Sequence, residues 1–495
     1  MNSSRIGFLT VSILLPALGV FFITNALTSG GNVIANSAIL LMIVGFLIGL
    51  IKPKAAMYFT ILATGYLDLI KRLMILDSTV RFEDLYYILG IPPCIMSGMI
   101  LHYLLIHLKN HRESKEDLMR FIICSMLAAV MGATQLRAGM SALGNAANAA
   151  VYLYMLYIMP CLIKEGLNIR KFLTFIFFVF IPVALYGVYQ SKFGLMKFEM
   201  DYLLSGLSLE IRQLNERIFR PFSTMNAAGN LSTVASSFCA LCLIMSLSIS
   251  KKISSRIGFL IAAVIFGYGA YITFSRGGWI CGVSIILFYL AFRYKLTTIG
   301  LYLTAITAFV LLFAYSGTLV KNDKMAELSH MLSGEEGGDE RSMATRLGTF
   351  TSRLISLDLT RTTPARWRPF GVIIEGVSTE QFSGSRYNDR RYYVHDGFSH
   401  ILLSVGYIPM FIVFIFASYF LIKSHTSIWK IRDKDNRLFC LMLFSASAGI
   451  FVGFFANSAQ IQTYPVNFYL YFFLGAALAY MKVYRPDFTN RSSLA

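Results

Sequence analysis

The sequence predicts an all-α, polytopic membrane protein, and its composition and hydropathy carry that prediction. Of its 495 residues, 56% are hydrophobic and only 14% are charged, whereas about 25% of the residues in a soluble globular domain are charged. The mean hydropathy is +0.62. Apolar stretches close to the ~20 residues that a helix needs to cross a bilayer recur along the whole chain.

Window length and flanking charge predict about fourteen transmembrane helices. The first is the apolar run that starts at Ile6 behind the single basic residue Arg5, and it is long enough to remain as a helix. The later spans follow from the same two criteria. The predicted spans are residues 6–28, 32–51, 55–70, 85–108, 119–136, 148–163, 170–190, 232–250, 257–273, 277–293, 296–316, 398–424, 437–457 and 464–482.

The distribution of basic residues predicts the orientation of these helices. An even number of spans places both termini on one side of the membrane, and the short basic connections all fall on that side. By the positive-inside rule, that side is the cytoplasm. The connections are Lys52 and Lys54, Lys109 to Lys115, Lys164 to Lys171, Lys251 to Arg256, Arg293 with Lys295, and Lys423 to Arg437.

Two long loops on the outer side interrupt the helices, at residues 191–231 and 317–397. After the acidic stretch "GEEGGDE" of the second loop, apolar residues recur at helical spacing with Arg346 and Arg353 on another face, which predicts an amphipathic helix on the outer leaflet. The predicted division of the chain is therefore 1–190, an N-terminal bundle; 191–316, a bundle with the first outer loop; 317–397, the extracytoplasmic loop; and 398–495, the C-terminal helices.

Arginine is prominent on the predicted outer side, whereas lysine dominates the inner connections. The net charge of +18 does not indicate nucleic acid, because the sequence contains no soluble domain to present a basic face. The rigid fork of arginine suits bidentate contacts with phosphate or carboxylate, so the outer arginines indicate a multiply charged ligand. The alternative for each of them is an ordinary ion pair with an acidic residue. The seven cysteines lie in or beside apolar spans and indicate core residues, with no metal site or cofactor expected.

Three short motifs stand at the outer ends of predicted spans. They are "RPFSTMNAAGN" (220–230), "TFSRGGWI" (273–280) and "HDGFSHILLSVGYIP" (395–409). Each also has a purely structural interpretation: Ser223 or Asn226 caps a helix, Ser275 with two glycines makes a turn, and His395 bonds backbone groups. Ionisable groups at the end of a membrane helix nevertheless indicate a functional site.

A site that contains arginines and a histidine but no metal ion suits the transfer of a sugar from a lipid-linked pyrophosphate. The pyrophosphate is already a good leaving group, so fixed guanidinium groups need only neutralise its developing charge. The acceptor hydroxyl needs a general base, and an ordinary histidine pKa of about 6.5 suits that role at neutral pH. Asp396 adjoins His395 and would lie one helical turn before His400, so it could orient an imidazole.

The three motifs resemble those of the O-antigen ligase and polymerase superfamily, membrane enzymes that act on undecaprenyl-linked glycans. His395, Leu402 and Gly406 match the family's histidine helix, while Asp396 stands where the family has Asn and Pro409 stands where it has a second glycine. The family's Ser-Arg-Gly hairpin resembles "SRGG", and its aromatic-x-x-Asn-x-x-Ala stretch resembles "FSTMNAAG". Its stretch before the histidine helix resembles "RWRPFGVIIEG" (366–376).

The resemblance implies a helical fold of the GT-C type, a lipid-linked donor that enters from the outer leaflet, and no metal or other cofactor. It implies His395 as the base, Arg276 and Arg220 as a pyrophosphate clamp, and Asn226 at the site. The arginines of the long loop are expected as further substrate-binding residues, namely Arg346, Arg353, Arg390 and Arg391. Asp396 and His400 are candidate substrate-binding residues from their place beside His395.

The leading expectation is a surface-polysaccharide polymerase in the bacterial inner membrane, with its active site on the periplasmic face. Its expected partners are an undecaprenyl-pyrophosphate-linked glycan, membrane lipids and a chain-length regulator. A ligase that transfers finished glycan to the lipid A core is the alternative within the family. A transporter or flippase of lipid-linked oligosaccharide is an alternative of another class, favoured by Asp68 and by the pair Pro92 and Pro93.

Overall fold

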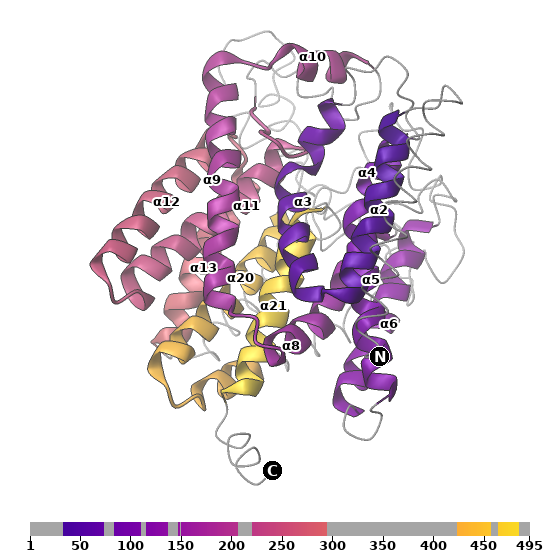
Figure 1. Ribbon diagram of the computed structural model, residues 1–495. Coiled ribbons are helices and arrows are strands. Elements are labelled where there is room, and N and C mark those ends of the chain that lie inside the picture. The colour runs from indigo at the N-terminus through magenta and orange to yellow at the C-terminus, as the bar shows by residue number, and fades with distance from the viewer. Residues whose placement is uncertain are drawn as a thin grey trace, which may run out of the picture. The chain divides into compact units, whose positions relative to one another are not determined.

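The computed structural model describes residues 33–73, 84–109, 115–136, 147–148, 150–205, 220–294, 423–456 and 464–484. Within these ranges the chain is all-α, with thirteen α-helices and no strand (Figure 1). The helices are α2 (Val33–Ile51), α3 (Pro53–Leu73), α4 (Asp84–Leu89), α5 (Ile91–Lys109), α6 (Lys115–Leu136), α8 (Met155–Lys164), α9 (Ile169–Phe193), α10 (Lys197–Leu204), α11 (Ala228–Ile244), α12 (Ile253–Tyr271), α13 (Arg276–Arg293), α20 (Lys434–Ala456) and α21 (Val466–Val483).

The chain forms two compact units. The first comprises Met1–Leu287, Ile428–Gly453 and Gln460–Ala495, and the second comprises Phe288–Ser427 with Phe454–Ala459. Nearly all of the described residues belong to the first unit. In the second unit, the ring of His425 packs against that of Phe292, with 5.1 Å between the centroids. The four-part division predicted from the sequence stays a prediction.

Every predicted span that falls within the described residues coincides with helical structure. Six helices are long and apolar enough to cross a bilayer, and they indicate a multi-pass membrane protein. They are Tyr87–Lys109, Ile169–Phe193, Ala228–Ile249, Ile253–Tyr271, Lys434–Gly453 and Val466–Val483. The predicted spans 6–28 and 296–316, and nearly all of 398–424, lie outside the described residues.

Two of these membrane-length helices depart from a continuous α-helix. The predicted span 85–108 changes direction at Gly90, where α4 ends and α5 begins with Pro92 and Pro93 in its first turn, a position that tolerates proline because the first amides have no partner within the helix. α11 ends in a π-helical turn, η5 (Met245–Ile249), which extends it to the basic connection at Lys251.

The core is built from small residues and aromatic rings. α2 and α5 approach so closely that a Cβ atom added at Gly98 would lie 2.1 Å from the carbonyl oxygen of Phe46, which is the close backbone approach that small residues permit between membrane helices. Farther along the bundle, the Phe238 ring makes edge contacts with Phe180 and Tyr469, at 5.1 Å between centroids in both cases. These contacts tie α11 to α9 and α21.

The basic connections meet at one end of the first unit, as the sequence predicts. Lys54 bonds the carbonyl oxygen of Glu165, and Lys164 lies 2.5 Å from a carboxylate oxygen of Asp117. The same end holds the ion pair of Lys482 with Glu116, at 2.6 Å, and that of Lys251 with Asp435. Arg170 links these groups by bonding Asn436 at 3.1 Å. We call this the basic end.

Candidate functional site

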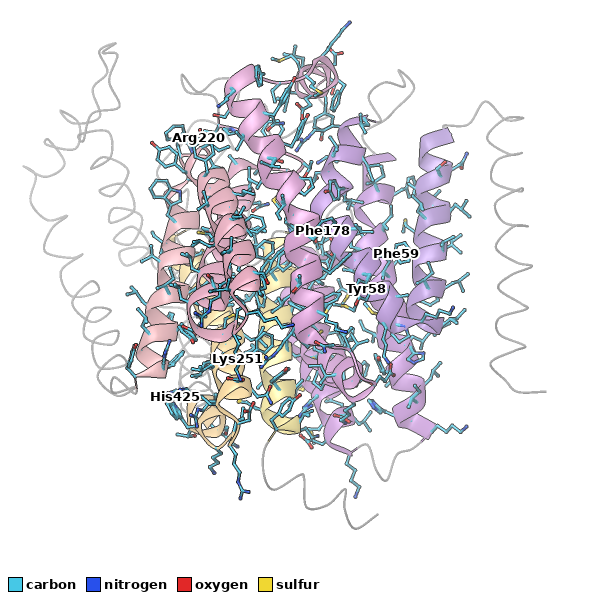
Figure 2. All side chains as sticks on the ribbon, turned by 60° about the vertical axis from the view of Figure 1, so that its left-hand side comes forward. Tyr58, Phe59, Phe178, Arg220, Lys251 and His425 are labelled. Atoms are coloured by element: carbon cyan, nitrogen blue, oxygen red, sulfur yellow. The ribbon has the colours of Figure 1, made fainter. Side chains whose placement is uncertain are left out.

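The residues predicted to form the site divide into those that the structure describes and those that it does not. Arg220 and Asn226 are described, and Arg276 is the first residue of α13, with its backbone alone described. Figure 2 shows Arg220 and Lys251 near opposite ends of the helices, so the first motif lies away from the basic end. The other site residues lie outside the described residues. They are Arg346, Arg353, Arg390, Arg391, His395, Asp396 and His400.

The segment that follows Arg220 is held by buried hydrogen bonds. Ser223 has a left-handed backbone with φ 56°, a conformation that non-glycine residues adopt only where surrounding contacts enforce it. The side-chain oxygen of Gln190 accepts bonds from the backbone amides of Phe222 and Ser223, at 3.2 and 2.6 Å. The hydroxyl of Thr224 donates to the carbonyl oxygen of Gly65. The motif is therefore a fixed part of the bundle.

Arg72 at the end of α3 is the main anchor of this segment. Its guanidinium is fully buried and donates to the carbonyl oxygens of Ser223 and Met225. It also pairs with Glu199 of α10, at 3.3 Å, and lies 4.2 Å from the centroid of the Phe222 ring. Arg72, an arginine on the predicted outer side, is therefore held in a buried ion pair with Glu199.

Glu199 is fully buried as well, and both of its carboxylate oxygens accept further hydrogen bonds. Its Oε1 accepts a bond from the amide of Gln190 at 2.8 Å, and its Oε2 accepts one from the backbone amide of Met196 at 3.1 Å. Such additional bonds offset the cost of burying an ion pair, although the Nε of Arg72 has no hydrogen-bond partner among the described residues. Figure 1 shows α3, α9 and α10 meeting at this end of the bundle.

Asn226 stands just before α11 and faces the helix. It is half-buried, and its side-chain oxygen accepts a bond from the amide of Asn230. Asn230 also bonds the carbonyl oxygen of Tyr464, at 3.4 Å. The N-cap of α11 is Ala227, which makes no side-chain cap bond. Neither Ser223 nor Asn226 therefore caps the helix, so that structural interpretation of the motif is wrong.

The Ser-Arg-Gly hairpin lies directly against α11, the helix that follows the first motif. The hydroxyl of Ser232 in α11 donates to the carbonyl oxygen of Ser275, at 3.0 Å. A Cβ atom at Gly278 would lie 2.1 Å from the Ser232 hydroxyl oxygen, so only glycine lets α13 start this close to α11. The structure thus places the Ser-Arg-Gly hairpin against α11, two residues beyond the first motif.

The arrangement offers positive electrostatic potential without a metal. The first amides of α11 and α13 carry the positive ends of two helix dipoles, and Arg276 belongs to the first turn of α13. Within the described ranges, no group of three His, Cys, Asp or Glu side chains is placed to hold a metal ion. The nearby Asp68 is buried and already paired with Lys71, at 3.0 Å.

Sequence reasoning missed the residues that fix the site, namely Glu199 and Gln190. The available signal was a glutamine inside the apolar run of α9, where a polar side chain needs a buried partner. Comparisons of the chain with family models, with curated proteins and with solved structures found no match.

Proposed function

We propose that the protein is a metal-independent glycosyltransferase of the GT-C type that polymerises a surface polysaccharide. The observation that supports this most directly is the contact between the Ser-Arg-Gly hairpin, at Ser275, and α11 just after the first motif, at Ser232. It sets the starts of α11 and α13 beside each other, with Asn226 and Arg276 at those starts. Two converging helix N-termini with an arginine suit a phosphate-bearing ligand.

In this proposal the donor is a glycan on undecaprenyl pyrophosphate. The acceptor hydroxyl oxygen of a second lipid-linked repeat unit attacks the anomeric carbon, and the bond from that carbon to the pyrophosphate oxygen breaks. His395 takes the hydroxyl proton, with Asp396 and His400 beside it. Arg276 and Arg220 neutralise the departing pyrophosphate, and Arg346, Arg353, Arg390 and Arg391 bind the charged substrate farther out.

The proposed orientation follows from the charges of the two ends. The basic end faces the cytoplasm by the positive-inside rule, so the motif end faces the periplasm, where the lipid-linked donor is delivered. About fourteen spans, with both termini inside, complete this topology in the bacterial inner membrane. A chain-length regulator is the further partner.

The two alternatives make different predictions. A ligase would use the same groups but a different acceptor, the lipid A core. A transporter needs ionisable groups near the middle of the bilayer; Asp68 and Lys71, however, lie in the last two turns of α3, next to the Arg72 anchor. That position favours a role at the end of the helix over a transport pathway.

The test is to delete the gene in its host and to complement with the wild type or with His395→Ala. The surface glycan is then run on a gel beside a stain for the lipid A core. A polymerase predicts core with a single repeat unit and no ladder in the deletion strain, restored by the wild type and not by the variant.

Two other results of this experiment would contradict parts of the proposal. Bare core with long lipid-linked polymer accumulating would identify a ligase. A ladder restored by His395→Ala, at wild-type protein level in the membrane, would overturn the assignment of the base.

A further inference from the structure

A cleft of about 360 Å³ opens at the basic end, far from the motifs described above. It lies between the first turn of α9, the π-helical turn η5, the connection at Ser250 and the first turn of α12. Its lining residues are Arg170, Lys171, Thr174, Met245, Ile249, Ser250, Lys251, Lys252, Ser255, Phe259 and Asp435. All of them belong to the first unit.

The cleft has a strong excess of positive charge. One lining residue is acidic, and that residue, Asp435, is already paired with Lys251. Arg170 is held in place because it bonds Asn436 at 3.1 Å and its guanidinium lies 4.9 Å from the centroid of the Phe439 ring. Among the described residues, no acidic group pairs with Lys171 or Lys252, and both are exposed. These two cations are therefore available to a ligand.

Hydroxyl groups and backbone amides complete the polar wall. The cleft is lined by Thr174, Ser250 and Ser255, and it lies at the start of α12, whose N-cap residue Lys252 makes no side-chain cap bond. The first amides of that helix are therefore open to an acceptor. The hydroxyls of Thr174 and Ser255 already donate within the protein, at 3.1 and 3.4 Å. The donors that suit the oxygen atoms of a phosphate group are therefore the first amides of α12 and the two lysines.

The other wall is apolar and continues onto a surface suited to lipid. Met245, Ile249 and Phe259 line the cleft. An exposed apolar stripe continues along α9 at helical spacing from Lys171 and Thr174, with Phe178 and Leu185 exposed by 74% and 49%. A polar group at the cleft would thus adjoin a surface where acyl chains lie.

We propose that the cleft binds the phosphate headgroup of an anionic phospholipid from the same leaflet, with the acyl chains along α9. Basic pockets between membrane helices on the cytoplasmic side are suited to such headgroups. The adjoining apolar stripe favours a lipid over free phosphate, since a soluble ion would have no use for it. The site is separate from the glycan chemistry proposed above.

The experiment uses the full chain purified in detergent and measures lipid binding by native mass spectrometry. The probes are dioleoyl phosphatidylglycerol and dioleoyl phosphatidylethanolamine. The test variant is Lys171→Gln with Lys252→Gln, and the matched control is Lys52→Gln with Lys115→Gln, which removes two exposed lysines from the same end outside the cleft.

We expect the test variant to bind phosphatidylglycerol at least about tenfold more weakly than the wild type. The control should stay within about twofold, because its lysines reach the headgroup only through the screened solvent. The thermal unfolding midpoint of both variants without added lipid should match that of the wild type, since the substituted side chains are exposed.

Three results would overturn the proposal. The first is equal affinity of the wild type for the two phospholipids, and the second is equal loss of affinity in the test and control variants. The third is an increase in thermal stability on adding inorganic phosphate with none on adding phosphatidylglycerol, which would identify a soluble anion as the ligand.

Discussion

At the scale of the residue, one buried arginine connects the end of α3 to the segment that carries Arg220 and Asn226. Arg72 → Ala would leave the Glu199 carboxylate buried without its ion-pair partner. It would also leave the carbonyl oxygens of Ser223 and Met225 without the guanidinium donor. Removing one partner of a buried, bonded ion pair costs about 3–5 kcal/mol. We expect a large fall in the unfolding midpoint in detergent.

The control for this prediction is Arg432→Ala, at an exposed position of the basic end. A surface substitution of that kind changes the free energy of unfolding by about 0.5 kcal/mol or less. Equal midpoints for the two variants would show that Arg72 does not anchor the segment.

Arg276 tests the proposed chemistry at the same scale. A planar guanidinium can bond two phosphate oxygens at once, whereas an ammonium group is a point charge. Arg276→Lys should therefore abolish the polysaccharide ladder while the protein stays in the membrane. Arg293→Lys, at the opposite end of the same helix α13, should keep the ladder. If Arg276→Lys also keeps it, the proposed pyrophosphate contact is wrong.

At the scale of the element, the packing of α13 against α11 depends on Gly278. A methyl group there would meet the Ser232 hydroxyl and backbone, and forced overpacking costs about 1–3 kcal/mol. Gly278→Ala should lower the unfolding midpoint and, by shifting the start of α13, the activity as well. Gly258→Ala is the matched control, because nothing lies within 4 Å of the added atom. A neutral effect of both would contradict the close approach.

The helices themselves were predictable, because hydropathy and length are local properties of the sequence. The shared end of the basic connections was also predictable, since their charges follow the positive-inside pattern. The partners of Arg72 were not, because Glu199, Ser223 and Met225 lie more than a hundred residues away in the chain and no local pattern marks the pairing. Gly278 looked like a turn residue, and only the neighbouring helix reveals its packing role.

At the scale of the whole molecule, carboxylates of α6 join helices at the basic end. Burial raises the pKa of Asp117, but Lys164, Lys482 and Arg120 together outweigh burial and hold that pKa below its usual value. Burial also raises the pKa of Glu116, while Lys482 and Arg120 lower it. The net effect is again a lowered pKa of that carboxyl. A carboxyl with a lowered folded pKa stabilises the fold above its unfolded pKa, and this stabilisation disappears as pH falls through the folded value.

We therefore expect the unfolding midpoint of the wild type to fall between about pH 5 and pH 3. Glu116→Gln with Asp117→Asn should lower the midpoint at pH 7 and flatten this dependence. Asp201→Asn, at an exposed carboxylate of α10, should leave it unchanged. The same slope in all three proteins would show that the α6 ion pairs do not contribute.

The orientation of the molecule decides whether the proposed chemistry is feasible, because a donor in the outer leaflet can reach only an end that faces the periplasm. Lys192 lies exposed near the end of α9, two residues from Gln190, and Ser254 lies exposed in the first turn of α12 at the basic end. The seven native cysteines are free and buried or half-buried, so a membrane-impermeant maleimide should report mainly on an introduced thiol. Lys192→Cys should be labelled in cells with an intact inner membrane, and Ser254→Cys only after that membrane is opened. The reverse pattern would place the motif end in the cytoplasm and exclude the polymerase and the ligase together, whereas labelling of both from one side would show that α11, the helix between the two positions, does not span the membrane.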